Sequence, residues 1–247
     1  LGMYPVLQGY SGMVPNNINE HFSDIDIIPQ GTWCSFERPT MLRTTSPVFK
    51  EFAKKFYKAQ EEVYGNYSIY FATDPFHEGG KVEDMSPKEI SFEVLGAMLK
   101  FNKNAVWIIQ SWLRNPTSEL LAGLDLVPDG KSHALILDLY AEKDPNYKKG
   151  CEGNPNYGYS KEFDSTPWIF CMLNNFGGRL GLHGHLDNLA NWIPEAYNTC
   201  SSIAGIGITP EASFNNPVLY DFLFESVWRD SFDGEIEVIN LDSWICD

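Results

Sequence analysis

The chain has 247 residues and a formal net charge of −15, and 43% of its residues are hydrophobic and 21% charged. This composition excludes a disordered chain, and the acidic excess disfavours nucleic acids and anionic membrane surfaces as partners, because both attract basic surfaces. The length suits one α/β barrel or two smaller domains, and a neutral substrate is the partner that the charge best accommodates.

Six short apolar runs are predicted as β-strands, and none approaches the roughly 18 apolar residues of a membrane-spanning helix. In chain order they are Tyr4–Gln8, Ser68–Thr73, Ala105–Gln110, Ala134–Tyr140, Trp168–Leu173 and Ile203–Ile208. Because these runs are almost wholly apolar and do not alternate, they are typical of strands buried on both faces of a parallel sheet.

Helical patterns separate several of these strands. Ser46-Pro47 opens a helix over Val48–Tyr64, Ser86-Pro87 opens a second with Glu89 in a capping box, and Pro217–Trp228 forms a third. The alternation predicts an α/β fold with right-handed crossovers. A closed barrel of this kind has eight strands, whereas six are predicted here. The fold is therefore either an incomplete barrel or an open doubly wound sheet. No Gly-x-Gly-x-x-Gly motif follows an early strand, which disfavours a dinucleotide-binding sheet.

One face of the first helix is expected to be buried. The apolar residues on it are Phe49, Phe52, Phe56, Ala59 and Val63. Three long segments, Gly9–Ser46, Glu142–Thr166 and Phe176–Ser201, are predicted to be strand-to-helix connections, from which barrel enzymes build their active sites.

Polar and aromatic residues stand directly after five of the strands. They are Asp74 to Gly80 (DPFHEGG), Ser111-Trp112, Asp138 to Glu142 (DLYAE), Asn174 to Gly178 (NNFGG) and Thr209-Pro210-Glu211. If the strands are parallel, these groups share one rim, which is rich in carboxylates, amides and aromatic rings. Two carboxylates facing one bond are what glycoside hydrolysis requires, and aromatic faces stack on sugars.

One block of this rim, WIFCMLNNFGG at 168–178, resembles a signature of glycoside hydrolase family 89, the α-N-acetylglucosaminidases. Further similar stretches are MYPVLQGYSGMVP at 3–15, QGTWCS at 30–35, AVWIIQSWL at 105–113, LILDLYAE at 135–142 and the Thr209-Pro210-Glu211 end. The resemblance implies a (β/α)8 TIM-type barrel with about six of its eight strands over residues 1–233, and the start of a helical domain or tail at 234–247. The chain opens without an initiator Met and is expected to be a piece of a longer polypeptide.

The resemblance also implies an activity and its residues. Family members release terminal α-linked N-acetylglucosamine with retention of configuration, and Glu78 matches the acid/base and Glu211 the nucleophile. The expected substrate-binding residues are Trp33, His77, Trp112, Asp138, Leu139, Tyr140, Asn175 and Phe176, of which His77 stands where relatives often have Asn. No cofactor or metal is implied, and the expected location is extracellular or lysosomal.

Each candidate also has a plainer interpretation. Glu78 and Glu211 are alternatively solvent-facing loop residues, although Glu211 is expected to be partly buried because an apolar strand precedes it. Asp138 is equally suited to a structural hydrogen bond, and Trp33, Trp112 and Phe176 to the core. Two other functions remain as alternatives, a non-catalytic carbohydrate-binding barrel fragment and a metal-dependent hydrolase that uses His183 and His185. The five cysteines lack metal-binding spacing, and Cys171 is expected to be a small buried residue.

Overall fold

The computed structural model describes residues 2–76, 78, 80, 85–151, 162–178, 184–229 and 236–246, with the backbone alone at 150 and 151. His77 and His183 therefore lie outside the described residues. The chain divides into two compact units, one with the described residues up to Ile136 and one with those from Leu137 onward. Each unit is described by itself, and the boundary expected near residue 233 stays a prediction.

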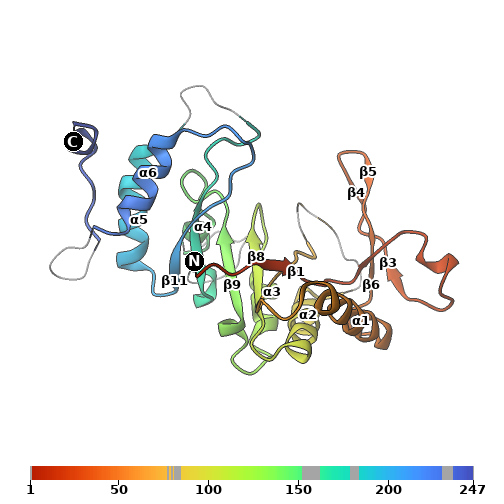
Figure 1. The fold of residues 1–247 in the computed structure, drawn as a ribbon. Coiled ribbons are helices and arrows are strands. Elements are labelled where there is room, and N and C mark those ends of the chain that lie inside the picture. The colour runs from red at the N-terminus through yellow and green to blue at the C-terminus, as the bar shows by residue number, and fades with distance from the viewer. Residues whose placement is uncertain are drawn as a thin grey trace. The chain divides into compact units, whose positions relative to one another are not determined.

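In the described part of the chain the main sheet has six strands, all of them at predicted positions (Figure 1). In sheet order they are β1 (Val6–Gln8), β7 (Tyr70–Ala72), β8 (Val106–Ser111), β9 (Ala134–Asp138), β10 (Trp168–Met172) and β11 (Ile203–Ile208). The β1–β7, β7–β8 and β10–β11 pairs run parallel. The order follows the chain without a reversal, as in a barrel, and confirms the α/β class.

Three α-helices of the first unit lie within its described residues. They are α1 (Pro47–Tyr64), α2 (Pro87–Phe101) and α3 (Ser118–Leu124), and a 3-10 helix, η3 (Gly130–His133), follows α3. α2 packs against both α1 and α3 (Figure 1). Ser46 and Ser86 are the predicted N-caps, but the Ser86 hydroxyl accepts from the Lys88 amide rather than from that of Glu89.

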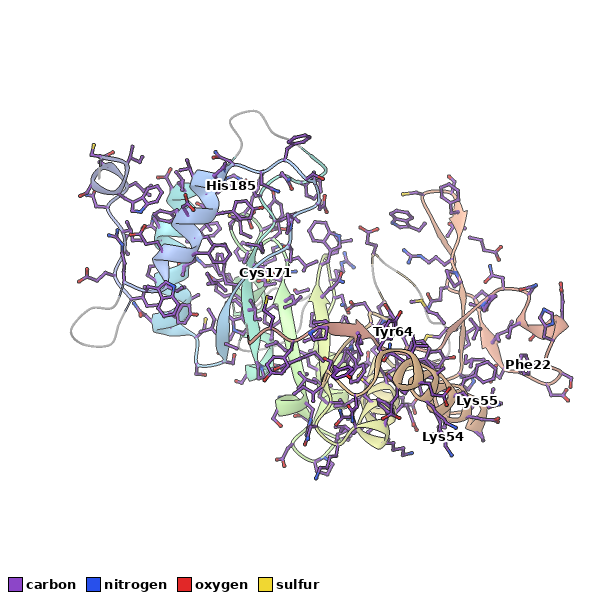
Figure 2. All side chains as sticks on the ribbon, viewed as in Figure 1. Phe22, Lys54, Lys55, Tyr64, Cys171 and His185 are labelled. Carbon is purple, nitrogen blue, oxygen red and sulfur yellow. The ribbon has the colours of Figure 1, made fainter. Side chains whose placement is uncertain are left out.

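The buried face of α1 differs from the predicted one. Phe49 is buried as expected, but the other buried positions are Ala53 and Tyr57, whereas Ala59 and Val63 are exposed. The Tyr57 hydroxyl accepts a hydrogen bond from the Tyr10 amide at 3.0 Å, and this long-range contact turns the Tyr57 side of the helix inward. Figure 2 shows the exposed Lys54 and Lys55 on the same helix.

The long segment between β1 and α1 contains small antiparallel elements that the sequence did not indicate. β2 (Met13–Val14), β6 (Thr40–Leu42) and β3 (Ile27–Ile28) form one sheet, η1 (Ile18–Glu20) is a 3-10 turn, and β4 (Thr32–Trp33) pairs with β5 (Phe36–Glu37) in a hairpin. Strands of two or three residues are too short to show a period in the sequence.

The second unit contains β10, β11 and further helices. These are α4 (Asn146–Cys151), η4 (Glu162–Ser165), α5 (Leu186–Thr199), α6 (Pro217–Ser226) and α7 (Leu241–Cys246). α5 lies inside the segment that was wrongly predicted to be a connection, and it lies beside α6 (Figure 1). α6 buries Leu219, Phe222 and Leu223.

Cys171 on β10 (Figure 2) is buried, as predicted, and burial raises the pKa of its thiol far above the ordinary range. A side chain at Gly207 of the neighbouring strand would contact its Sγ, so this glycine makes room for the thiol. Among the described helices, none is both long enough and apolar enough to cross a membrane.

Candidate active site

Glu78 lies just past β7, in the first unit. Its φ of 49° is in the left-handed region, which a residue with a side chain rarely adopts. The indole Nε1 of Trp112 donates a hydrogen bond to Glu78 Oε1 at 3.2 Å, and Arg38 Nη2 donates to the backbone oxygen of Glu78 at 2.8 Å. The predicted candidates Glu78 and Trp112 are therefore in direct contact.

Trp112 is itself held in a turn after β8. Its amide and carbonyl exchange two backbone hydrogen bonds with Asn115, of 3.1 and 3.0 Å. The Asn115 side chain donates to Asp74 Oδ1 at 3.1 Å, and the Gln110 amide donates to the same oxygen at 3.0 Å. Burial raises the pKa of Asp74 to about 7, against these hydrogen bonds, which lower it. Asp74 was not singled out from the sequence, although it directly follows a predicted strand.

A hollow of about 430 Å³ opens beside Glu78. It is lined by Glu78 and by residues of the β4–β5 hairpin and the segment directly after it, namely Trp33, Phe36, Glu37, Arg38 and Pro39. The structure thus brings Trp33, a predicted substrate-binding residue, to the same hollow as Glu78. Trp33 is 48% exposed, so it does not belong to the core, which was its plainer interpretation.

Glu211 lies after β11, in the second unit, and the Gly177 amide donates a hydrogen bond to its Oε2 at 2.6 Å. The amide of Glu211 donates to Asn175 Oδ1 at 3.2 Å. Glu211 is exposed, which contradicts the expected partial burial. The reason is that the preceding strand, β11, is an edge strand of the described sheet.

Asn175 organises the segment that carries Glu211. It is 1% exposed, and its Nδ2 donates to the carbonyls of Ala212 and Phe214 and to Asn215 Oδ1, at 3.3, 3.0 and 2.9 Å. Gly177 has a φ of +66°, a conformation that favours glycine and lets its amide face the carboxylate. The Asn-Asn-Phe-Gly-Gly block therefore fixes Glu211 through one side chain and one backbone amide.

Three further predicted residues lie near this segment. The rings of Tyr140 and Phe176 stack with their centroids 5.7 Å apart, and both are half-buried. Leu139 is also half-buried, and its carbonyl accepts a hydrogen bond from the Thr209 hydroxyl at 2.7 Å. These contacts tie the strand end after β9 to the segment that leads to Glu211.

Asp138 is fully buried, and its carboxylate accepts hydrogen bonds from the amides of Asn146 and Tyr147, at 3.3 and 3.0 Å. These contacts agree with a structural role for Asp138, because they fix the start of α4. A role in substrate binding stays a prediction. Glu142, 1% exposed, similarly accepts hydrogen bonds from the amides of Leu173 and Asn174, the latter at 2.7 Å.

Burial raises the pKa of Asp138 and of Glu142 to about 7, as it does for Asp74. A carboxyl in the unfolded chain has a pKa near 4, so the folded protein binds more protons than the unfolded chain between about pH 4 and pH 7. The protonated form of each of these buried carboxyls is favoured by folding. Their contribution to the free energy of unfolding is therefore fully present below about pH 4, and it declines as the pH rises to about 7. The upper limit is about 1.4 kcal/mol per pH unit for each group.

We expect urea unfolding of the protein to show lower stability at pH 7.5 than at pH 5. Glu142→Gln should reduce this difference, because it removes one of the three described carboxyls whose pKa burial raises to about 7. The matched variant Glu61→Gln, at an exposed position on α1, should leave the difference unchanged. Equal stability at both pH values, or an equal effect of both variants, would contradict the expectation.

A metal centre was one alternative interpretation. Within the described part of the chain, no three or more His, Cys, Asp or Glu residues are grouped so that they could hold a metal ion. His185 precedes α5 (Figure 2), while His183, its proposed partner, lies outside the described residues. The structure therefore describes no ligand set for this alternative.

A parallel α/β sheet with glutamates after two of its strands is the arrangement of a barrel glycosidase. The family model described as the alpha-N-acetylglucosaminidase (NAGLU) tim-barrel domain matches residues 1–230. The chain belongs to this family, and its six strands form an incomplete TIM barrel. This confirms both the resemblance and the predicted fold.

Individual relatives agree with this assignment. The human alpha-N-acetylglucosaminidase is 32% identical over an alignment of 242 residues, which covers 92% of this chain and 31% of the human protein. A family 89 glycoside hydrolase from Clostridium perfringens in complex with PUGNAc is 37% identical, with a TM-score of 0.85 over 99% of this chain and 26% of that protein. The same enzyme with two glutamate-to-glutamine substitutions, in complex with its substrate GlcNAc-alpha-1,4-galactose, gives a TM-score of 0.86 over the same shares. The chain thus spans about a third or less of these relatives.

Proposed function

We propose that this chain carries the two catalytic carboxylates of a retaining α-N-acetylglucosaminidase, which releases terminal α-linked N-acetylglucosamine. One observation carries the proposal beyond family membership. Each of the two glutamates follows a strand of the sheet and accepts a hydrogen bond from an N–H group on its carboxylate, from the Trp112 indole for Glu78 and from the Gly177 amide for Glu211. Such donors orient a carboxylate for attack or proton transfer.

Glu211 is the nucleophile in this mechanism. It attacks the anomeric carbon from the β face and forms a β-glycosyl ester. The 2-acetamido group of the substrate lies on the same face as an α-linked leaving group, so it cannot attack from the rear. An enzyme carboxylate is therefore needed, and the Gly177 amide, 2.6 Å from Oε2, directs the other oxygen of Glu211 toward this task.

Glu78 is the acid and then the base. It protonates the oxygen that leaves with the aglycone, and it afterwards takes a proton from the water that hydrolyses the ester. Trp112 holds one of its carboxyl oxygens during both steps. The C. perfringens variant with two glutamates replaced, in complex with its substrate, supports a requirement for a pair of glutamates. The extracellular or lysosomal location stays a prediction.

The stereochemistry of the first product tests this function. We expect ¹H NMR of the complete protein hydrolysing a 4-nitrophenyl α-N-acetylglucosaminide to show α-N-acetylglucosamine first, before mutarotation. The β-anomer first would mean inversion, a single displacement by water. Sugar binding without any hydrolysis would favour the non-catalytic alternative and contradict the proposal.

A further inference from the structure

Two exposed aromatic side chains, Trp33 and Phe36, belong to the β4–β5 hairpin, whose backbone is drawn in Figure 1. Trp33 and Phe36 are partners in its register, so their side chains share one face of the hairpin. They are 48% and 72% exposed. Cys34 and Ser35 between them both have positive φ, which closes the hairpin in two residues and places Trp33 and Phe36 directly before and after the turn.

This hairpin is attached to the proposed acid/base. Both aromatic residues line the hollow of about 430 Å³ that also includes Glu78. Arg38, directly after β5, donates its hydrogen bond to the backbone oxygen of Glu78, and its own amide donates to the Gly31 carbonyl at the other end of the hairpin. The aromatic pair therefore has a defined place relative to the Glu78 carboxyl.

The chemistry of Glu78 assigns a ligand to this hollow. In the proposed mechanism Glu78 protonates the oxygen that joins the anomeric carbon to the leaving group, so the leaving sugar lies beside its carboxyl. We infer that the β4–β5 hairpin forms the binding site of the leaving sugar, with the rings of Trp33 and Phe36 as its stacking platform. The inference rests on the proposed function and adds Phe36, which the sequence did not single out, as a residue that determines specificity.

The lining also indicates the class of leaving group. Aromatic rings stack on the C–H face of a neutral hexose. Glu37 and Arg38 in the same lining supply one acceptor side chain and one donor side chain, which suit hydroxyl groups. With Glu78, the lining holds two carboxyl groups and one guanidinium group, so it has no excess of positive charge and favours a neutral sugar over an anionic one.

Two substrates of the complete protein separate this inference from the proposed function. One is a disaccharide of α-linked N-acetylglucosamine on galactose, whose leaving group is a sugar. The other is α-N-acetylglucosaminyl fluoride, whose leaving group is too small to reach the hairpin. We expect Phe36→Ala to lower kcat/KM for the disaccharide about tenfold and to leave kcat/KM for the fluoride unchanged.

Two further variants complete the test. Phe36→Tyr keeps an aromatic ring and should retain the disaccharide activity, and Phe224→Ala, at an exposed phenylalanine of α6, should alter neither substrate. Unchanged fluoride hydrolysis also shows that the Phe36→Ala variant is folded. An equal loss on both substrates, or no loss on the disaccharide, would overturn the inference and leave the proposed function standing. Failure of the unsubstituted protein to cleave either substrate would instead overturn the proposed function, and the inference with it.

Discussion

Glu211→Ala is expected to lower kcat of the complete protein by about 10⁴-fold or more, which corresponds to about 5.5 kcal/mol of activation free energy. The variant cannot form the glycosyl ester, but it leaves a space where the carboxylate stood. A small anion such as azide should enter this space and partly restore turnover of a substrate with a good leaving group. Because azide attacks from the β face, the product should be the β-azide.

The surroundings of Glu211 make this variant informative. The side chain is exposed, and its removal leaves in place the hydrogen bonds that Asn175 makes to the following segment, so we expect the fold to persist. Glu237→Ala, at another exposed glutamate of the same unit, serves as the matched control and should keep full activity. Formation of the α-azide, or undiminished activity without azide, would show that Glu211 is not the nucleophile.

The strands of the sheet were predictable because strands that are buried on both faces consist of continuous apolar runs. Helix α5 was not, because Pro194 stands inside it and a glycine-rich stretch precedes it, both of which are typical of loops. The buried face of α1 was only partly predictable. Tyr57 is buried through its hydroxyl contact with the Tyr10 amide, 47 residues away in the chain, and a helical period carries no information about such a partner.

In the site, too, contacts that follow from the order of the strands were predictable, and contacts that depend on loop geometry were not. Glu78 and Trp112 follow neighbouring parallel strands, so their proximity follows from the order of the sheet. Gly177 and Glu211 follow the neighbouring strands β10 and β11 in the same way. Phe36 was not predicted as a site residue, because its hairpin lies in a long connection and strands of two residues show no period in the sequence. What the sequence lacked was therefore the local geometry of loops rather than the topology.

Glu78→Gln is expected to lower kcat/KM by a factor that depends on the leaving group of the substrate. A sugar departs poorly without a proton, so kcat/KM for a disaccharide should fall by about 10²- to 10⁴-fold. A 2,4-dinitrophenyl group departs without protonation, so kcat/KM for that substrate should stay near the value of the unsubstituted enzyme. The glutamine retains an oxygen that can accept the hydrogen bond from Trp112, so the geometry of the loop should survive the substitution.

Glu89→Gln, at an exposed position of α2, is the matched control and should affect neither substrate. An equal fall for both substrates would mean that Glu78 does not act as the acid.

The geometry of the complete barrel gives an independent check. In a crystal structure of the complete protein, a retaining pair should place the carboxyl groups of Glu78 and Glu211 about 5–5.5 Å apart, because the nucleophile must itself reach the anomeric carbon. A separation of about 6.5–9.5 Å would leave room for a water molecule between carboxylate and sugar, and Glu211 would then be a base that activates this water.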